Sequence, residues 1–304
     1  MTDIVIFRRK GLGLGSARGL KQWGAQNDVN FIISTHDDVP DTADMVVRWG
    51  NRQSLSEKGI PSDAPVLNAG EMIGAVNNKK NFAIRVGDSI IGQLPVATDL
   101  ETLRLLEDNL DHGQWVVRPR HHAQGRNFHL TEVTGVRDVI PRNFGTDWYA
   151  RPFINKAREY RVYVVCGRVV NVAEKIPVDR DAPAWNSNTR GASAGAEFVN
   201  VRWDNWPENV VQLACEVAHL AGIHYTGVDI MTEQGTDNAY FIEANSAPSL
   251  PLKTDGTMTY RHECVGKALK WTAENGRDMM LPVGGGWRGY VHPAINHNAI
   301  VGSE

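Results

Sequence analysis

Two acidic residues and one asparagine form the most informative pattern in the chain. The segments Gly227–Glu233 and Ala239–Asn245 flank a short polar loop and predict a β-hairpin. We expect the last residue of the first strand to pair with the first residue of the second. Asp229 then lies directly opposite Glu243, and Asn245, two residues further along, lies on the same face of the sheet.

This arrangement has the chemistry of a divalent metal site. Two carboxylates that face each other repel unless a cation lies between them. Two carboxylates and an amide oxygen form an all-oxygen ligand set, which suits a hard cation such as Mg²⁺. The alternative is a solvated polar face with unrelated charges, and the apolar neighbours Phe241 and Ile242 beside Glu243 argue against it.

The same two segments resemble a known family. Residues 227–230 (GVDI) and residues 243–250 (EANSAPSL) resemble the GVDI…E-x-N-x-x-P-G-L signature of ATP-grasp enzymes. The likeness is greatest to the carboxylate–amine ligases that include ribosomal-protein glutamate ligases. In that family the acidic pair and the asparagine hold Mg²⁺ (or Mn²⁺) against the phosphates of ATP. The resemblance therefore implies Asp229, Glu243 and Asn245 as metal ligands, with serine in place of the usual glycine at position 249.

The resemblance covers most of the chain from Lys79 onward and implies a set of residues that bind ATP. They comprise a lysine pair, a strand-end arginine, a loop over the phosphates, a hinge between two lobes, an acid that contacts ribose and a loop asparagine: Lys79 and Lys80; Arg118; Gln124, Gly125 and Arg126; Arg151, Pro152, Phe153 and Ile154; Glu159; and Asn188. The spacing to Pro95 favours Lys80 within the lysine pair. For the lysines and both loops, ordinary surface residues and turns are the alternative.

Two of these positions depart from the family. Arg118 stands before Pro119 where the family has lysine, and arginine keeps the positive charge but neither deprotonates nor has the same shape. Pro152 stands where the family often has glutamate, and proline has no N–H to donate. We therefore expect adenine recognition to depend on neighbouring backbone groups. Because of these departures, an alternative function stays open: a nucleotide-binding regulator that has the same fold but does not catalyse ligation.

Three basic residues are implied as catalytic. Arg161 shares one strand face with Glu159 because side chains alternate, although a structural Glu–Arg pair is the alternative. Lys175 ends the partner strand of a hairpin predicted over Tyr160–Lys175, and Arg190 lies in a polar loop. The implied reaction transfers the γ-phosphoryl group of MgATP to a carboxylate. An amine then displaces phosphate from the acylphosphate and forms an amide.

The elements that must position these residues predict an α/β and α+β chain. The patterns favour strands at Ile4–Phe7, Phe31–Ser34 and Met45–Arg48 with a helix at Ala17–Ala25. A second helix follows a Thr98–Glu101 capping box, and strands follow at Gln114–Arg118 and Phe128–Val133. Beyond the two hairpins above, later helices are expected from Pro207 to Gly222 and over Thr257–Asn275. The resemblance implies an ATP-grasp fold whose two lobes clamp ATP. We predict an N-terminal pre-ATP-grasp α/β domain over residues 1–75, a first lobe over 76–148, a second lobe with the metal site over 149–281, and an irregular tail over 282–304.

Composition excludes several classes of protein. The 304 residues include 32 basic and 35 acidic ones, a formal charge of −3, and 42% are hydrophobic. These values fit a globular protein of about two domains and exclude a basic coat for nucleic acid. The cysteines Cys166, Cys215 and Cys264 form no CxxC pair and predict a reducing compartment. Neither a signal peptide nor a membrane-spanning run is recognisable, so we expect a soluble, cytoplasmic protein.

A further resemblance concerns the setting of the protein. Residues 46–51 (VVRWGN) and 158–161 (REYR) look like those of small ATP-grasp proteins encoded by bacteriophages, which implies the host cytoplasm. The implied partners are a carboxylate and an amine substrate, either small molecules or peptides, or a modified nucleotide. A metal-dependent nuclease that uses Asp229 and Glu243 is a weaker alternative, because the chain has no basic tract. The sequence identifies neither the substrates nor the oligomeric state.

Overall fold

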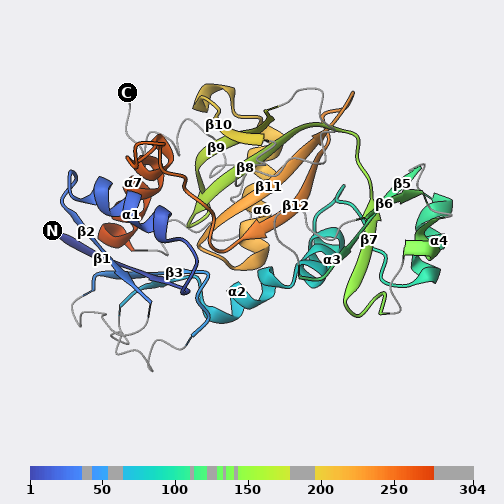
Figure 1. The fold of residues 1–304 in the computed structure, drawn as a ribbon, viewed down its shortest axis with the longest axis horizontal. Helices are drawn as coiled ribbons and strands as arrows, with labels where there is room; N and C mark the ends of the chain where they lie inside the picture. Colours follow the sequence, from blue (N-terminus) through green and yellow to red (C-terminus); the bar gives the residue numbers. More distant parts are fainter. Residues whose placement is uncertain are drawn as a thin grey trace.

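The computed structural model describes residues 1–35, 43–53, 64–109, 113–121, 129–132, 135–139, 143–178 and 196–276. These residues form three β-sheets that follow one another across the molecule, joined by short helices (Figure 1). The N-terminal sheet lies at one end, a five-stranded sheet in the middle and a three-stranded sheet at the other end. No helix in this part of the chain is both long enough and apolar enough to span a bilayer.

The N-terminal sheet is parallel, with the strand order β2-β1-β3-β4. Its strands are β1 (Thr2–Arg8), β2 (Val29–Ser34), β3 (Met45–Trp49) and β4 (Val66–Leu67). Helix α1 (Leu14–Gly24) connects β1 to β2 and starts earlier than the expected Ala17. Its N-cap is Gly13, whose φ of 67° is a left-handed conformation that glycine adopts without strain. The predicted early strands and the α/β character of this region are confirmed.

The three-stranded sheet is antiparallel, in the order β6-β5-β7. It consists of β5 (Gln114–Pro119), β6 (His129–Glu132) and β7 (Trp148–Pro152), with α4 (Leu100–Asn109) and α5 (Val136–Val139) beside it. The expected Thr98–Glu101 capping box is wrong. Asp99 is the N-cap instead, and its Oδ1 accepts the N–H of Thr102 at 2.7 Å. An aspartate is as good a cap as a threonine, and its charge also suits the positive end of the helix.

The five-stranded sheet has the order β10-β9-β8-β11-β12, and all its neighbouring strands are antiparallel. The strands are β8 (Lys156–Val165), β9 (Arg168–Pro177), β10 (Ala196–Asn200), β11 (Tyr225–Glu233) and β12 (Ala239–Asn245). Both predicted hairpins are confirmed. The first turns at Cys166 and Gly167, whose φ angles of 46° and 79° suit the tight turn that joins twisted strands.

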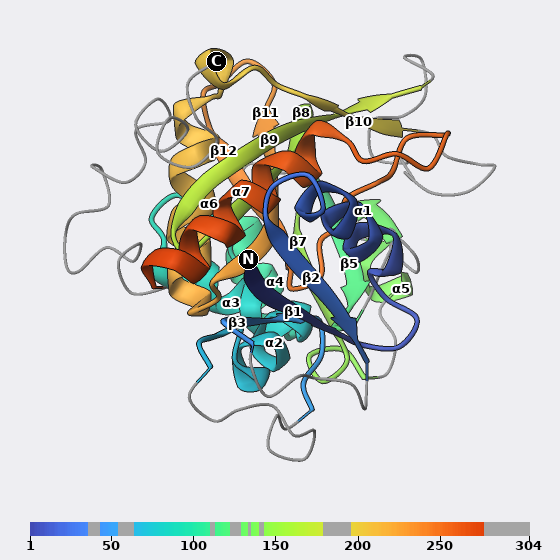
Figure 2. The ribbon, with the colours of Figure 1, turned by 90° about the vertical axis from the view of Figure 1, so that its left-hand side faces the viewer.

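Helices cover the two faces of the five-stranded sheet separately. Val162 and Val164 of β8 pack with α6 (Glu208–Ala221), whereas Tyr163 and Val165 point the other way. On that second face lie the N-terminal sheet, α1 and α7 (Tyr260–Asn275), which share one hydrophobic core with β8 and β9 (Figure 2). Helices α2 (Gly70–Asn77) and α3 (Lys79–Ser89) lead from the N-terminal sheet toward the three-stranded sheet (Figure 1).

Helices α1 and α7 approach each other closely through two glycines. A Cβ atom on Gly19 of α1 would lie 2.2 Å from Nε2 of His262, and one on Gly266 of α7 would lie 2.4 Å from the ring of Trp23. Each helix therefore offers a glycine to a ring of the other. The two ends of the described chain are joined by this reciprocal contact.

Candidate functional site

Asp229 and Glu243 lie opposite each other on β11 and β12, as the hairpin predicts. The pairing nearer the turn differs from the expectation, because Ala239 pairs with Thr232 and not with Glu233. A β-bulge at Ile242 inserts one extra residue into β12, and this shifts the register back by one. The two carboxylates therefore face each other only because of the bulge.

Asn245 lies with the two acids, as its place on the strand predicts. Its Nδ2 donates to Oε1 of Glu243 at 3.1 Å and lies 3.5 Å from Oδ2 of Asp229. Two carboxylates and one amide are few ligands for Mg²⁺, which takes about six oxygens and usually borrows them from phosphates and water. These three residues fit a magnesium ion that also binds a nucleotide.

Arg161 of β8 holds the carboxylate of Asp229 with both arms of its guanidinium. Its Nε donates to Oδ1 and its Nη2 to Oδ2, each at 2.6 Å, and both side chains are largely buried. Such paired charge-assisted bonds fix the position of the guanidinium and the direction in which its edge points. Burial by itself lowers the pKa of Arg161, but the charge of Asp229 outweighs this and raises it above the ordinary value.

Lys79 lies beside Glu243, the acid of β12. It is the first residue of α3, where the side chain of Asn78 accepts the N–H of Asn81 at 3.2 Å and starts the helix. Its Nζ lies 3.7 Å from Oε2 of Glu243 and donates to the backbone oxygen of Ala244. Lys80 instead donates to the backbone oxygen of Gly145. The two lysines of the predicted pair therefore have different partners: Lys79 lies beside Glu243 and Lys80 beside Gly145.

Glu159 accepts bonds from two lysines. Tyr160 pairs with Glu174, so Glu159 and Lys175 follow opposite each other on β8 and β9. The carboxylate oxygens accept from Nζ of Lys175 at 2.8 Å and of Lys156 at 2.7 Å. Burial alone raises the pKa of Glu159, but the charges and hydrogen bonds of Lys175 and Lys156 outweigh this and lower it below the usual value.

Lys156 is a member of this cluster that the sequence does not reveal. Strict alternation places residues 157, 159 and 161 on one face, which excludes position 156. The structure has a second β-bulge here, because Thr232 pairs with Arg158 and Glu233 pairs with Lys156, so that Ala157 is skipped. The skipped residue brings Lys156 onto the face of Glu159.

The strand-end and hinge residues of the three-stranded sheet lie near Glu243 and β12. Arg118 is the last residue of β5 before Pro119; it lies opposite Tyr149 of β7 and hydrogen bonds to its side chain. Burial raises the pKa of Tyr149, and the nearby charges of Arg118 and Arg151 oppose that rise. Nη1 of Arg151 donates to the backbone oxygen of Phe241 at 3.0 Å, which joins β7 to β12. Burial lowers the pKa of Arg151 to about 10.

The remaining hinge residues limit how a base could be recognised. The N–H of Phe153 donates to the backbone oxygen of Gln114 at 2.8 Å, and Pro152 has no N–H. The side chain of Ile154 is buried against Leu94 and Tyr240. The N–H of Phe153 is therefore already used within the sheet. Recognition of adenine by backbone groups near Pro152 would have to use other groups.

Several predicted residues lie outside the described part of the chain. Gln124, Gly125 and Arg126 belong to the segment 122–128. Asn188 and Arg190 belong to the segment 179–195. The predicted tail over 282–304 also lies outside it.

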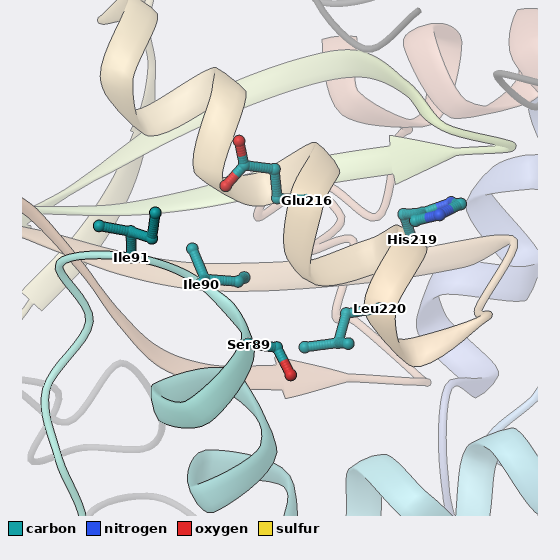
Figure 3. Close-up of a pocket in the computed structure, with 6 residues that line it drawn as sticks. All are labelled: Ser89, Ile90, Ile91, Glu216, His219 and Leu220. Carbon is teal, nitrogen blue, oxygen red and sulfur yellow. The ribbon is translucent and has the colours of Figure 1, made fainter. Parts of the chain in front are cut away.

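A separate hollow of about 420 Å³ lies between the end of α3 and helix α6 (Figure 3). Its lining includes Ile90 and Ile91 from the segment after α3 and Glu216 and His219 from α6. Because α6 covers the face of the sheet opposite to Asp229, this hollow does not belong to the candidate site.

No protein-family model matches the sequence, and no curated protein matches it either. Solved structures do match the three-dimensional arrangement. D-alanyl-alanine synthetase A from Vibrio cholerae is 16% identical with a TM-score of 0.59, and the match covers 90% of this chain and 99% of that one. The ATP-grasp ligase PsnB, complexed with a minimal precursor, Mg and ADP, is 13% identical with a TM-score of 0.58, over 89% and 97% of the chains.

A third match is the RiPP-associated ATP-grasp ligase of Chryseobacterium gregarium, in complex with ADP and a leader and core peptide. It is 12% identical with a TM-score of 0.56, over 92% of this chain and 96% of that one. At such identities a structural likeness shows the fold. The fold class predicted from the motifs is confirmed: this chain has the ATP-grasp fold.

Proposed function

We propose that the protein is an ATP-dependent carboxylate–amine ligase that forms an amide or peptide bond through an acylphosphate. The observation that carries the proposal is a cluster of paired charges along one face of the five-stranded sheet, completed by a lysine of α3. The sheet contributes Lys175, Glu159, Lys156, Arg161, Asp229, Asn245 and Glu243, and α3 contributes Lys79. Four cations surround three carboxylates, so the face favours an anionic ligand such as a polyphosphate.

The chemistry of the proposed reaction depends on position and charge. Asp229, Glu243 and Asn245 would hold Mg²⁺, which when bound neutralises phosphate oxygens. In this proposal Lys79 and Arg118 balance charge on the nucleotide. We assign Arg161 and Lys175 to the reacting carboxylate and the transferred phosphoryl group. Arg190 completes this set as a prediction from the sequence motif. Little covalent help from the protein is needed, since alignment and fixed charges lower the barrier.

The substrate class follows from the structural neighbours as part of the proposal. PsnB in one of its structures and the Chryseobacterium ligase are complexed with peptides, and D-alanyl-alanine synthetase is named for a dipeptide product. We therefore favour an amino acid or peptide as carboxylate and as amine. The likeness of residues 46–51 and 158–161 to bacteriophage proteins adds the host cytoplasm to the proposal.

The proposal is tested by the products of the reaction. The protein is incubated with MgATP and pooled carboxylates, amino acids and peptides, and the products are read by mass spectrometry. An amide that appears together with ADP and phosphate, and only when both a carboxylate and an amine are present, supports the ligase. AMP with pyrophosphate would exclude the acylphosphate route. Nucleotide binding without any condensation product would favour the regulator.

A further inference from the structure

Arg261 is a buried cation that no sequence motif singles out. It lies in the first turn of α7 and is only 5% exposed. Its Nε donates to Oδ1 of Asn200 at 2.8 Å, and its Nη2 donates to the backbone oxygen of Phe198. Asn200 and Phe198 belong to β10, so the guanidinium fork fastens this edge strand to the start of α7.

Two guanidinium groups lie over the ring of Phe198. The Cζ atom of Arg161 is 4.7 Å from the ring centroid, and that of Arg261 is 5.9 Å from it. A planar guanidinium stacks favourably on an aromatic face, and the attraction is strongest where water is excluded. In the sheet Phe198 of β10 is paired with Lys175 of β9, and the Nζ atom of Lys175 donates to Glu159.

We infer that Phe198 and Arg261 are positioning residues that set the orientation of Arg161. The inference rests on the proposed function, in which Arg161 faces the reacting carboxylate. Asp229 fixes two edges of the Arg161 guanidinium, and the ring of Phe198 fixes its plane. Arg261 in turn fixes the ring through the β10 backbone. A charge aimed at a transition state loses most of its effect when it is displaced by about 1 Å, a change that can lower the rate about a hundredfold.

The orientation of Arg161 is measured directly by nuclear magnetic resonance of the Nε–Hε group, identified by its loss in Arg161→Lys. We expect a distinct, slowly exchanging resonance in the wild type. Phe198→Leu removes the aromatic face and should shift and broaden this resonance. Arg261→Lys keeps the charge but loses the fork, and we expect the same change. Phe198→Tyr keeps the ring and should retain the wild-type resonance. An unchanged resonance in both Phe198→Leu and Arg261→Lys would overturn the inference.

The consequence for the reaction is measured in the same variants. We expect kcat to fall about tenfold to a hundredfold in Phe198→Leu and Arg261→Lys, while the Kd for MgADP changes less than about threefold. The matched control is Val199→Ala, which changes an exposed neighbour on the same strand and should leave kcat, Kd and the resonance unchanged. A lost resonance with unchanged kcat would overturn the positioning role and leave the ligase proposal intact. Absence of ligation by the wild type would reject the ligase, while the resonance would still decide whether Phe198 and Arg261 hold Arg161.

Discussion

Arg161 and Asp229 lie directly opposite each other on neighbouring strands, and one guanidinium holds both carboxylate oxygens at 2.6 Å. The residue that the motif predicts as a metal ligand is therefore already bound by a cation. A metal ion that binds one oxygen of Asp229 displaces one N–H of Arg161 from the carboxylate. A phosphate oxygen is a suitable new acceptor for that N–H. We therefore expect metal and nucleotide to bind together.

Removal of the other two metal ligands should abolish turnover without unfolding the protein. In Glu243→Ala combined with Asn245→Ala, the side chains that are lost belong to the partly exposed face of β12, so little core packing changes. ADP release at a series of Mg²⁺ concentrations is the measurement, and thermal unfolding is its control. Metal-dependent activity at the wild-type level in a folded double variant would reject the metal assignment.

Arg118 should contribute to nucleotide affinity through its charge. Arg118→Ala removes a cation at the end of β5 and should weaken ATP binding about tenfold or more, because hydrogen bonds to charged groups contribute about 1.5–3 kcal/mol. Arg118→Lys keeps the charge and should retain part of the affinity. Calorimetric titration with MgADP and with ATP compares the variants. Equal affinities for wild type and Arg118→Ala would remove this residue from the site.

His262 should make the stability of the protein sensitive to acid. Its ring is fully buried, its Nδ1 accepts the N–H of Thr259 at 3.0 Å, and burial lowers its pKa from 6.5 to about 4. The folded state therefore disfavours the proton that the unfolded state binds below about pH 6.5. The free energy of unfolding is therefore highest above about pH 6.5. It decreases by about 3 kcal/mol as the pH falls toward 4.

The measurement for His262 is urea unfolding between pH 7 and pH 4. The wild type should lose stability over this interval, and His262→Gln, which cannot titrate, should lose less. The difference between the two curves isolates this one group from the other histidines and carboxylates. Parallel curves would show that His262 does not titrate as its burial requires.

Gly19 should be required for the contact between α1 and α7. A Cβ atom there would lie 2.2 Å from Nε2 of the buried His262, so Gly19→Ala should destabilise the protein by about 1–3 kcal/mol. Gly15 is in the same helix, and a Cβ atom on it meets nothing within 4 Å. Gly15→Ala should therefore be neutral or stabilise by up to about 1 kcal/mol. Denaturant midpoints test both, and similar losses in the two variants would contradict the steric argument.

The sequence predicts both hairpins, the early strands, the longer helices and the opposed acids, but it does not predict α2, α3, β7 or β10. In the second hairpin the expected register near the turn was wrong. Alternation and turn residues locate the hairpins because these signals are local. The bulge at Ile242 has no such signal. The expected pairing of Glu233 with Ala239 places Asp229 opposite Glu243 without a bulge, whereas in the structure Ala239 pairs with Thr232 and the bulge brings the two acids opposite each other. The bulge at Ala157 also has no local signal, so the face on which Lys156 lies was not predicted.

Contacts between distant parts of the chain escaped prediction more completely. Arg261 and Phe198 lie on different elements, and neither periodicity nor spacing relates them. The division between Lys79 and Lys80 depends on how α3 is turned toward β12, which spacing to Pro95 does not fix. The predicted domain boundaries after residues 75, 148 and 281 stay predictions, as do the roles of the site residues.

The contact between α1 and α7 has a consequence for the synthesis of the protein. Ribosomes deliver α1 first and α7 only after all three sheets have been made. Until α7 emerges, Trp23 and Gly19 lack their contacts with Gly266 and His262, and the part of the shared core that α7 covers stays open to water. Such late closure between distant segments slows folding and exposes apolar surface to other nascent chains. We expect growing chains that end before Tyr260 to bind chaperones and to be cut readily by proteases.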